Sequence, residues 1–419
     1  MTLNIGRPLA EGLALGRKLI EAGAYSDAVQ CHRLIALRFP LEAKVYMALG
    51  QSFRARGDVD RMRRAFHRAL LLKPHASEIY FNFGNAERNH ENPVKARNHY
   101  KRALTIAPKE PNFATALAFA LLELECWHDA WPLYEKRDAC LRFNEALQRT
   151  NQKTWDGIVR PGERILVVCE QGRGDSILFI RYTKPLAEAG MKVYVHCQPE
   201  LKRLFASLPW ISGVSTTAQP EVDWHILTLS LPYRFDTKPE TIPAPIPYLK
   251  VPGNKDRKNQ SKYSKVGLVW TGSTENKRNN LRSAPRKAFT NLLSLKEIRF
   301  QSLQLGWRKD NVDESGPWGK VVELGDHIAD YADTAKIIAE QDLTISVCTS
   351  IAHLAGALGK PIWLLLGRQP YWLWLQNGPA TVWYPTMTIY RLGSGEDWED
   401  LLDRVADELN QFVHQKKSA

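Results

Sequence analysis

Three polar residues directly follow an apolar segment in the last fifth of the chain. Thr349, Ser350 and His353 come after the β-branched run 343–347 and open an Ala- and Leu-rich stretch that ends at the Gly-Lys-Pro of residues 359–361. This order predicts a buried strand, a tight turn and a helix, with Thr349 and Ser350 at the helix N-cap. Free backbone amides at a helix N-terminus, just beyond a parallel strand, attract phosphate. The segment is therefore a candidate phosphate site.

A second candidate site follows an earlier apolar run, residues 165–168. The next turn, QGRGD, contains Gly172, Gly174 and Asp175. Glycines let the backbone approach a ligand closely. A carboxylate at the carboxyl end of a parallel strand can serve as a general base. Alternatively, Asp175 only caps the helix that follows, which is a common role for Asp. The residues leave both interpretations open.

Further basic and polar residues follow two more predicted strands. Lys277 and Arg282 come after VGLVW, and Gln304 comes after FQSL. Lysine and arginine can add charge-assisted contacts to a phosphate. Gln304 is expected at the ligand edge of the sheet, in contact with a nucleotide base or ribose. His353 has two interpretations, either a contact to phosphate or sugar, or a buried histidine satisfied by the backbone.

Composition limits the class of protein. The chain has 419 residues, of which 44% are hydrophobic and 24% charged, as in globular proteins with two to three domains. It has neither an apolar run of membrane-spanning length nor an evident secretory signal, so we expect a cytoplasmic protein without a membrane span. Six cysteines without C-x-x-C spacing predict reduced thiols and no zinc site. The net charge of +12 comes with no nucleic-acid motif, so we expect no nucleic-acid partner.

The elements that must carry these residues begin with a repeat. Pro40, Pro74 and Pro108 recur every 34 residues, which is the tetratricopeptide (TPR) period. Large–small pairs keep the same register, at Leu15-Gly16, Leu49-Gly50 and Phe83-Gly84. We predict a TPR α-solenoid of about four repeats over residues 1–145.

Such a solenoid presents a groove that commonly holds a polypeptide, and the alternative is a collar that only stabilises or oligomerises the next domain. The candidate groove residues, all on first helices of a repeat, are Arg54, Asn82, Asn85 and Arg88.

Strand–helix alternation then occurs in two blocks. It predicts one Rossmann-like α/β lobe over 155–250 and a second over 262–395, with a proline-rich segment between them. An amphipathic C-terminal helix and tail, residues 396–419, are expected to pack back across the first lobe.

The chain resembles bacterial tetratricopeptide-repeat glycosyltransferase-like proteins in the order of the blocks WDG, ILVVCEQGRGDSILFIRY, SLP, PYL, VGLVWTGS, LRSAP, SLQ, DLTISVCTSIAHLAGALGKPIWLLLG and WYP. Their second part is similar to glycosyltransferase family nine, the ADP-heptose:lipopolysaccharide heptosyltransferases. The resemblance implies an α + α/β fold, in which the TPR solenoid precedes a GT-B pair of Rossmann-like lobes. It places the acceptor on the first lobe and the nucleotide-sugar mainly on the second.

The same resemblance implies a catalytic Asp at position 175 and a metal-independent transfer with no cofactor beyond the nucleotide-sugar substrate. The layout also resembles proteins that glycosylate flagellin or other polypeptides in the bacterial cytoplasm. The implied partners are a nucleotide-sugar and a polypeptide or glycan acceptor held through the TPR groove.

Two positions depart from the family pattern. Relatives carry Asp where this chain has Cys348, and D-W-R-W where it has residues 371–374, YWLW. Trp372, Trp374 and Trp383 could equally be packing residues. Two hypotheses follow: a glycosyltransferase with a changed donor specificity, or a catalytically degenerate TPR scaffold that retains the GT-B fold.

Overall fold

The chain folds into two compact units, Met1–Asp138 and Ala139–Ala419. The structure is a computed structural model that describes residues 8–217, 220–252, 263–273, 279–305, 316–368, 371–374, 378–393 and 395–418. The sequence placed the end of the repeats at residue 145. The boundary between the units falls earlier, at the first residue of α9 (Asp138–Arg149).

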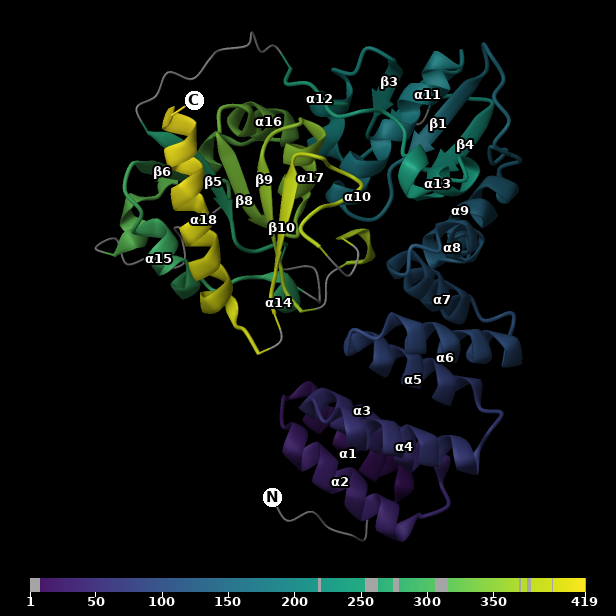
Figure 1. The fold of residues 1–419 in the computed structure, drawn as a ribbon. Helices are drawn as coiled ribbons and strands as arrows, with labels where there is room; N and C mark the ends of the chain where they lie inside the picture. The colour runs from purple at the N-terminus through teal and green to yellow at the C-terminus, as the bar shows by residue number, and fades with distance from the viewer. Residues whose placement is uncertain are drawn as a thin grey trace. The chain divides into compact units, whose positions relative to one another are not determined.

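The first unit is a stack of helical hairpins (Figure 1). Each odd-numbered helix pairs with the next, and the odd-numbered helices α1, α3 and α5 also pack on one another in order. The helices are α1 (Leu9–Glu21), α2 (Tyr25–Arg38), α3 (Ala43–Arg56), α4 (Val59–Leu72), α5 (Ser77–Asn89), α6 (Pro93–Ile106), α7 (Pro111–Glu123) and α8 (Trp127–Tyr134).

The repeat signal in the sequence has a direct packing cause. A Cβ atom on Gly50 would lie 2.8 Å from the ring of Phe66, and one on Gly84 would lie 2.5 Å from the ring of Tyr100. The α3–α4 and α5–α6 hairpins therefore close because a glycine on the first helix receives an aromatic ring from the second helix. The TPR prediction is confirmed.

The second unit begins with a four-stranded parallel sheet in the order β3-β2-β1-β4. Its strands are β1 (Arg164–Val168), β2 (Lys192–His196), β3 (Ile211–Ser215) and β4 (Trp224–Leu227). Its helices include α10 (Arg173–Phe179), α11 (Thr183–Glu188), α12 (Lys202–Phe205) and α13 (Leu231–Arg234). The chain runs outward from β1 to β3 and then returns to the other side of β1. The strand order therefore reverses between β1 and β4, where open α/β sheets bind ligands.

A six-stranded parallel sheet forms the second lobe, in the order β10-β9-β8-β5-β6-β7. Its strands are β5 (Ser264–Val269), β6 (Ile298–Ser302), β7 (Val322–Glu323), β8 (Leu343–Val347), β9 (Ile362–Leu366) and β10 (Met387–Arg391). Its helices include α14 (Asn279–Arg282), α15 (Thr290–Leu293), α16 (Tyr331–Ala339), α17 (Ser350–Ala357) and α18 (Trp398–Ser418). The order reverses between β5 and β8. Two parallel-sheet lobes after a helical repeat confirm the predicted fold class.

The prediction for the C-terminal helix was wrong. α18 packs on the second lobe, against α15 and β10, and not on the first lobe (Figure 1). Leu401, Val405 and Leu409 are fully buried there with Val266 and Leu268 of β5. The helix covers the apolar residues on one face of its own sheet, and this nearby apolar surface decides its position.

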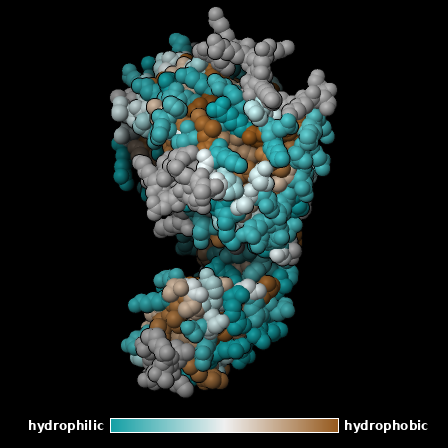
Figure 2. All heavy atoms as spheres, turned by 90° about the vertical axis from the view of Figure 1, so that its left-hand side faces the viewer, coloured by the Kyte–Doolittle hydropathy of each residue, from teal (hydrophilic) through white to brown (hydrophobic). Residues whose placement is uncertain are grey.

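The two lobes of the second unit contact one another through α10, which packs against α17. Arg203 of α12 forms ion pairs with Asp330 (2.7 Å) and Asp333 at the start of α16. On the surface, hydrophilic residues cover most of the face drawn in Figure 2, with some apolar areas between them. No helix among the described residues is both long and apolar enough to cross a membrane.

Candidate functional site

The candidate site lies where the reversal points of the two sheets meet. α10 follows the carboxyl end of β1, and α17 follows the carboxyl end of β8. Gly174, in the first turn of α10, allows the two helices to approach. A Cβ atom there would lie 2.8 Å from Cδ2 of His353 and 3.4 Å from Cα of Ser350. The structure thus brings Gly174, Ser350 and His353 together, although they are far apart in the sequence.

Asp175 occupies the third position of α10. Its Oδ2 accepts a hydrogen bond from the backbone N–H of Gly172 (3.1 Å), so the capping interpretation describes a real contact. The side chain is partly buried, and burial raises its pKa to about 6, with a further upward push from Glu170. The hydrogen bond from Gly172 and the charge of Arg282 act in the opposite direction. A carboxyl group with this pKa is suited to accept a proton near neutral pH.

Arg282 lies at the reversal point of the second sheet. One guanidinium nitrogen donates to the backbone oxygen of Cys348 (3.2 Å), and Nε donates to Oδ1 of Asn279 (3.1 Å). A Cβ atom on Gly272 would collide with this guanidinium, so a glycine after β5 makes room for it. Across the two lobes, the positive charge of Arg282 lowers the pKa of Asp175.

The polar residues of the α17 turn have partners within the protein. Thr349 is the N-cap residue, but its side chain makes no capping bond; its Oγ1 contacts Oγ of Ser346 (3.0 Å). Oγ of Ser350 contacts the hydroxyl of Tyr331 (2.7 Å). The side chain of Thr349 therefore does not cap the first amides of α17.

Gln304 follows β6, as the sequence indicated. Its Oε1 accepts a hydrogen bond from the backbone N–H of Thr271 (3.3 Å), so the side chain supports the loop after β5. Lys277, another predicted contact to the donor, lies outside the described residues.

His353 is 5% exposed and belongs to a chain of hydrogen bonds between the lobes. Its Nδ1 contacts the hydroxyl of Tyr384 (3.0 Å), which contacts the hydroxyl of Tyr248 (3.4 Å), and Tyr248 donates to the backbone oxygen of Ile177 (3.0 Å). Since Tyr248 donates to a carbonyl, Tyr384 donates to Tyr248, and His353 carries its proton on Nδ1. Burial lowers its pKa to about 3, so the imidazole is neutral near pH 7.

An aromatic cluster packs around Cys348. The indole N–H of Trp374 donates to Sγ of Cys348 (3.1 Å), and the Trp374 ring stacks on His353. Burial raises the pKa of the Cys348 thiol, which keeps it uncharged. Trp372, Trp374 and Trp383 are at most 1% exposed, which favours the packing interpretation for all three.

Sequence reasoning missed the tyrosines that hold this site. Tyr331, Tyr248 and Tyr384 are joined to α10 or α17 by hydrogen bonds. Two of them carried a signal, because Tyr384 belongs to the WYP block of the resemblance and Tyr248 to the PYL block, whereas Tyr331 carried none.

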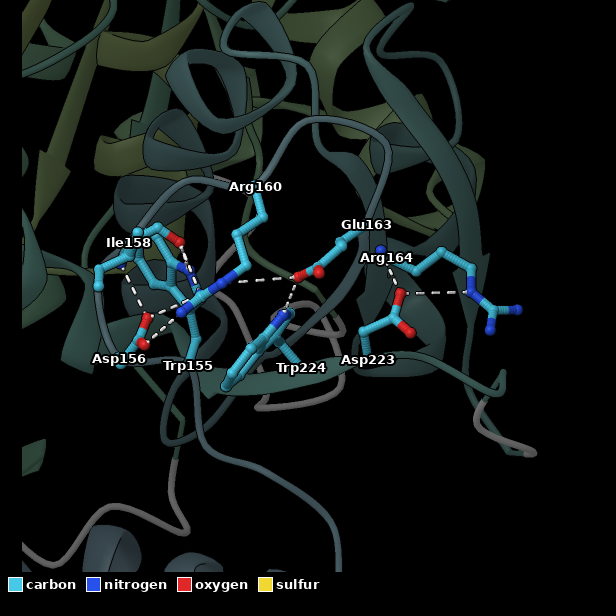
Figure 3. A network of polar contacts seen from close by, with 8 residues as sticks. All are labelled: Trp155, Asp156, Ile158, Arg160, Glu163, Arg164, Asp223 and Trp224. Carbon is cyan, nitrogen blue, oxygen red and sulfur yellow. Dashed lines mark hydrogen bonds and ion pairs between the residues drawn. The ribbon is translucent and has the colours of Figure 1, made fainter.

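The WDG block lies elsewhere. Figure 3 shows Asp156 paired with Arg160 (2.7 Å) near the amino ends of β1 and β4. The Arg160 guanidinium lies 4.4 Å from the centre of the Trp224 ring, whose N–H donates to Glu163. Asp175 follows the carboxyl end of β1. These contacts therefore stabilise the opposite end of the strands of the first sheet, away from Asp175.

Comparisons with known proteins find distant similarities. Protein FlbA of Caulobacter vibrioides is 24% identical over 430 residues, which cover 94% of this chain and 72% of FlbA. The structure of Escherichia coli ADP-heptose lipopolysaccharide heptosyltransferase II aligns with a TM-score of 0.41 and 13% identity, over 61% of this chain and 99% of that protein. No protein-family model matches the chain.

The TPR protein TTC0263 of Thermus thermophilus aligns with a TM-score of 0.30 and 19% identity, over 34% of this chain and 82% of that protein. At these low TM-scores, the description of the fold rests on the chain's own helices and sheets. Among the described residues, no group of three or more His, Cys, Asp or Glu side chains has the arrangement of a metal site.

Proposed function

We propose that this chain is a glycosyltransferase that moves a sugar from a nucleotide-sugar to a hydroxyl group of a polypeptide or glycan acceptor, without a catalytic metal. The observation that carries the proposal is Asp175. A carboxyl group with a pKa of about 6 lies on α10 at the reversal point of one sheet. α10 packs against α17, and Arg282 bonds the backbone oxygen of Cys348 just before α17, at the reversal point of the other sheet. Such a pair supplies a base and a cation on the two sides of one site.

In the proposed reaction, the acceptor oxygen bonds to the anomeric carbon of the sugar, and the bond from that carbon to the nucleotide phosphate breaks. The proton of the acceptor hydroxyl goes to Asp175. The amides of α17 and the guanidinium of Arg282 stabilise the charge on the departing phosphate. Neutral His353 adds no positive charge, so its role is a hydrogen bond or packing.

The first test is a thermal-shift panel of the purified chain with UDP-, GDP-, ADP- and CMP-sugars, each beside its free nucleotide. A ligand that binds only the folded state stabilises it by about 2.7 kcal/mol at a hundredfold excess over its dissociation constant. We expect one nucleotide class to raise the melting temperature, and Arg282→Gln to remove most of that increase. Arg299→Gln, an exposed change on β6, is the matched control. No shift with any nucleotide would contradict the proposal.

The second candidate function, a catalytically degenerate TPR scaffold, is favoured by Cys348. Cys348 has a thiol where relatives have a carboxylate. The indole N–H of Trp374 donates a hydrogen bond to this thiol. Under this alternative, the repeats recruit a partner and the two lobes serve only as a packed support.

Cys348→Asp distinguishes the two candidates. The two side chains influence one another electrostatically, since Asp175 raises the pKa of Cys348. A carboxylate at position 348 should therefore raise the pKa of Asp175 further. For an active enzyme, we expect lower turnover at pH 7 and recovery at higher pH, measured as a pH–rate profile, with Cys348→Ser as the control. Activity that appears only in Cys348→Asp would instead identify a decayed enzyme.

A further inference from the structure

Two successive repeats of the first unit carry an arginine at the same position, Arg54 and Arg88, and the two arginines differ in their partners. Arg88 on α5 donates through Nε to Oε1 of Glu123 on α7 (2.8 Å), and Glu123 is only 7% exposed. Glu123 follows Arg88 by 35 residues, so the pair joins two successive repeats. Arg54 holds the equivalent position one repeat earlier, 34 residues before Arg88. The residue 35 positions after Arg54 is Asn89, which is neutral.

The position of Arg54 is well defined by its neighbours on the seam between α3 and α5. Nε2 of Gln51 donates to Oδ1 of Asn82 across this seam (2.9 Å). Arg54 lies three residues after Gln51, and Asn85 and Asn89 lie three and seven residues after Asn82. At helical spacing, these residues continue along the same seam. Asn85 is also engaged, since its Oδ1 accepts from the hydroxyl of Tyr100 (2.8 Å).

The guanidinium of Arg54 has no compensating charge. The side chain is partly buried, and among the described residues it has neither an ion pair nor a side-chain hydrogen bond. Burial lowers the pKa of Arg54, and no carboxylate contributes to it. Burying a charge without a partner costs stability. At the equivalent position one repeat later, Arg88 has a carboxylate partner, Glu123, within the protein.

A second polar group near Arg54 also lacks a partner. Nε2 of His90, at the carboxyl end of α5, is buried without a hydrogen bond among the described residues. Burial lowers the pKa of His90, and the charge of Arg54 is among the effects that lower it further. A ligand anion beside Arg54 would therefore also lie near a ring nitrogen able to donate.

We propose that Arg54 binds a carboxylate side chain of a polypeptide that lies along the α3–α5 seam, in the role that Glu123 has for Arg88. The planar carboxylate matches the fork of donors on a guanidinium. This inference deepens the proposed function, because it rests on the repeats recruiting a polypeptide and gives that polypeptide an acidic residue.

Stability gives a test that needs neither a partner nor turnover. In the full chain, we expect Arg54→Gln to raise the melting temperature by about 2 °C, because an uncompensated charge is removed. Asn89→Glu should raise it similarly by creating the pair seen in the next repeat. Arg88→Gln should lower it, because Glu123 is then buried alone. A lower melting temperature for both Arg54→Gln and Asn89→Glu would overturn the proposal.

Binding is measured by fluorescence anisotropy with a labelled glutamate–alanine peptide and its glutamine–alanine counterpart. We expect the acidic peptide to bind preferentially, and Arg54→Gln and Asn89→Glu to weaken it by about tenfold, which corresponds to about 1.4 kcal/mol. Arg102→Gln, an exposed change on α6, should leave binding unchanged. Equal binding to wild type and Arg54→Gln would overturn the proposal. Displacement by inorganic phosphate but not by acetate would also overturn it.

Discussion

Asp175→Asn is expected to reduce sugar transfer by about a thousandfold, within the range that general bases contribute. The substitution removes the group that takes the proton of the acceptor hydroxyl. It keeps the size of the side chain and an oxygen that can accept the hydrogen bond from Gly172, so α10 should begin as before. Turnover with the donor identified in the nucleotide panel measures the effect.

The same carboxyl group predicts a pH dependence. Wild-type turnover should fall as the pH drops through about 6, because Asp175 then becomes protonated. The effect on stability has the opposite direction. The folded-state pKa is raised above its ordinary value of 3.8, so the stabilisation from this group is complete below about pH 4 and is lost as the pH rises through about 6.

At pH 7.5, ionised Asp175 therefore lowers the free energy of unfolding, by about 1–2 kcal/mol after allowance for partial exposure. Asp175→Asn should be as stable as the wild type or more stable at that pH, although its turnover is expected to be about a thousandfold lower. Asp223→Asn is the control, because the Asp223 carboxylate accepts a hydrogen bond from the backbone N–H of Arg164 at the amino end of β1, away from the site. Unchanged turnover in Asp175→Asn would remove this residue from the mechanism.

The sequence predicts most of the fold because its signals are local. The 34-residue period reflects contacts within one hairpin, such as Gly50 with Phe66. The turn after β8 is visible because Thr349 lies two residues after the end of a buried strand. The alternation of strands and helices predicts two parallel sheets, but their strand orders, and with them both reversal points, come from the structure. Hence the sequence places Asp175 and Ser350 each just beyond the carboxyl end of its own strand, and the structure adds that their two helices pack together.

The parts that the sequence does not predict depend on partners far along the chain. Tyr384 and Tyr248 fix the proton on His353 from segments 31 and 105 residues away, and neither spacing has a periodic signal. α18 is amphipathic, which predicts a buried face but not the surface that buries it. Among the described strands, β10 pairs with β9 alone, at the edge of the sheet, and no strand is predicted there from the sequence.

Arg181 is the clearest long-range case, and it is almost completely buried at 2% exposure. Its guanidinium donates to the backbone oxygens of Pro243 (2.8 Å), Ala244 (2.9 Å) and Trp383 (3.2 Å). It also lies 4.5 Å from the centre of the Tyr248 ring. One side chain of the first lobe therefore holds both the connecting segment and a loop of the second lobe. Backbone carbonyl groups, and not a carboxylate, accept the hydrogen bonds of its guanidinium.

Arg181→Met should lower the free energy of unfolding of the second unit by about 3–5 kcal/mol, because three buried carbonyls lose a charged donor at once. Arg181→Lys should have an intermediate effect, since an ammonium group cannot reproduce the planar fork. Lys184→Met is the matched control on α11, where the ion pair with Glu188 is exposed and worth under about 1 kcal/mol. Urea unfolding followed by tryptophan fluorescence measures all three variants.

The effect on transfer then separates stability from the coupling of the lobes. Asp175 and Arg282 belong to different lobes, so their separation depends on the contacts that hold α10 against α17. If Arg181 fixes that arrangement, Arg181→Met assayed well below its melting temperature should still lose turnover, because misplaced reacting groups cost rate even in a folded enzyme. A folded Arg181→Met with wild-type turnover would show that the three carbonyl contacts stabilise the chain without positioning the site.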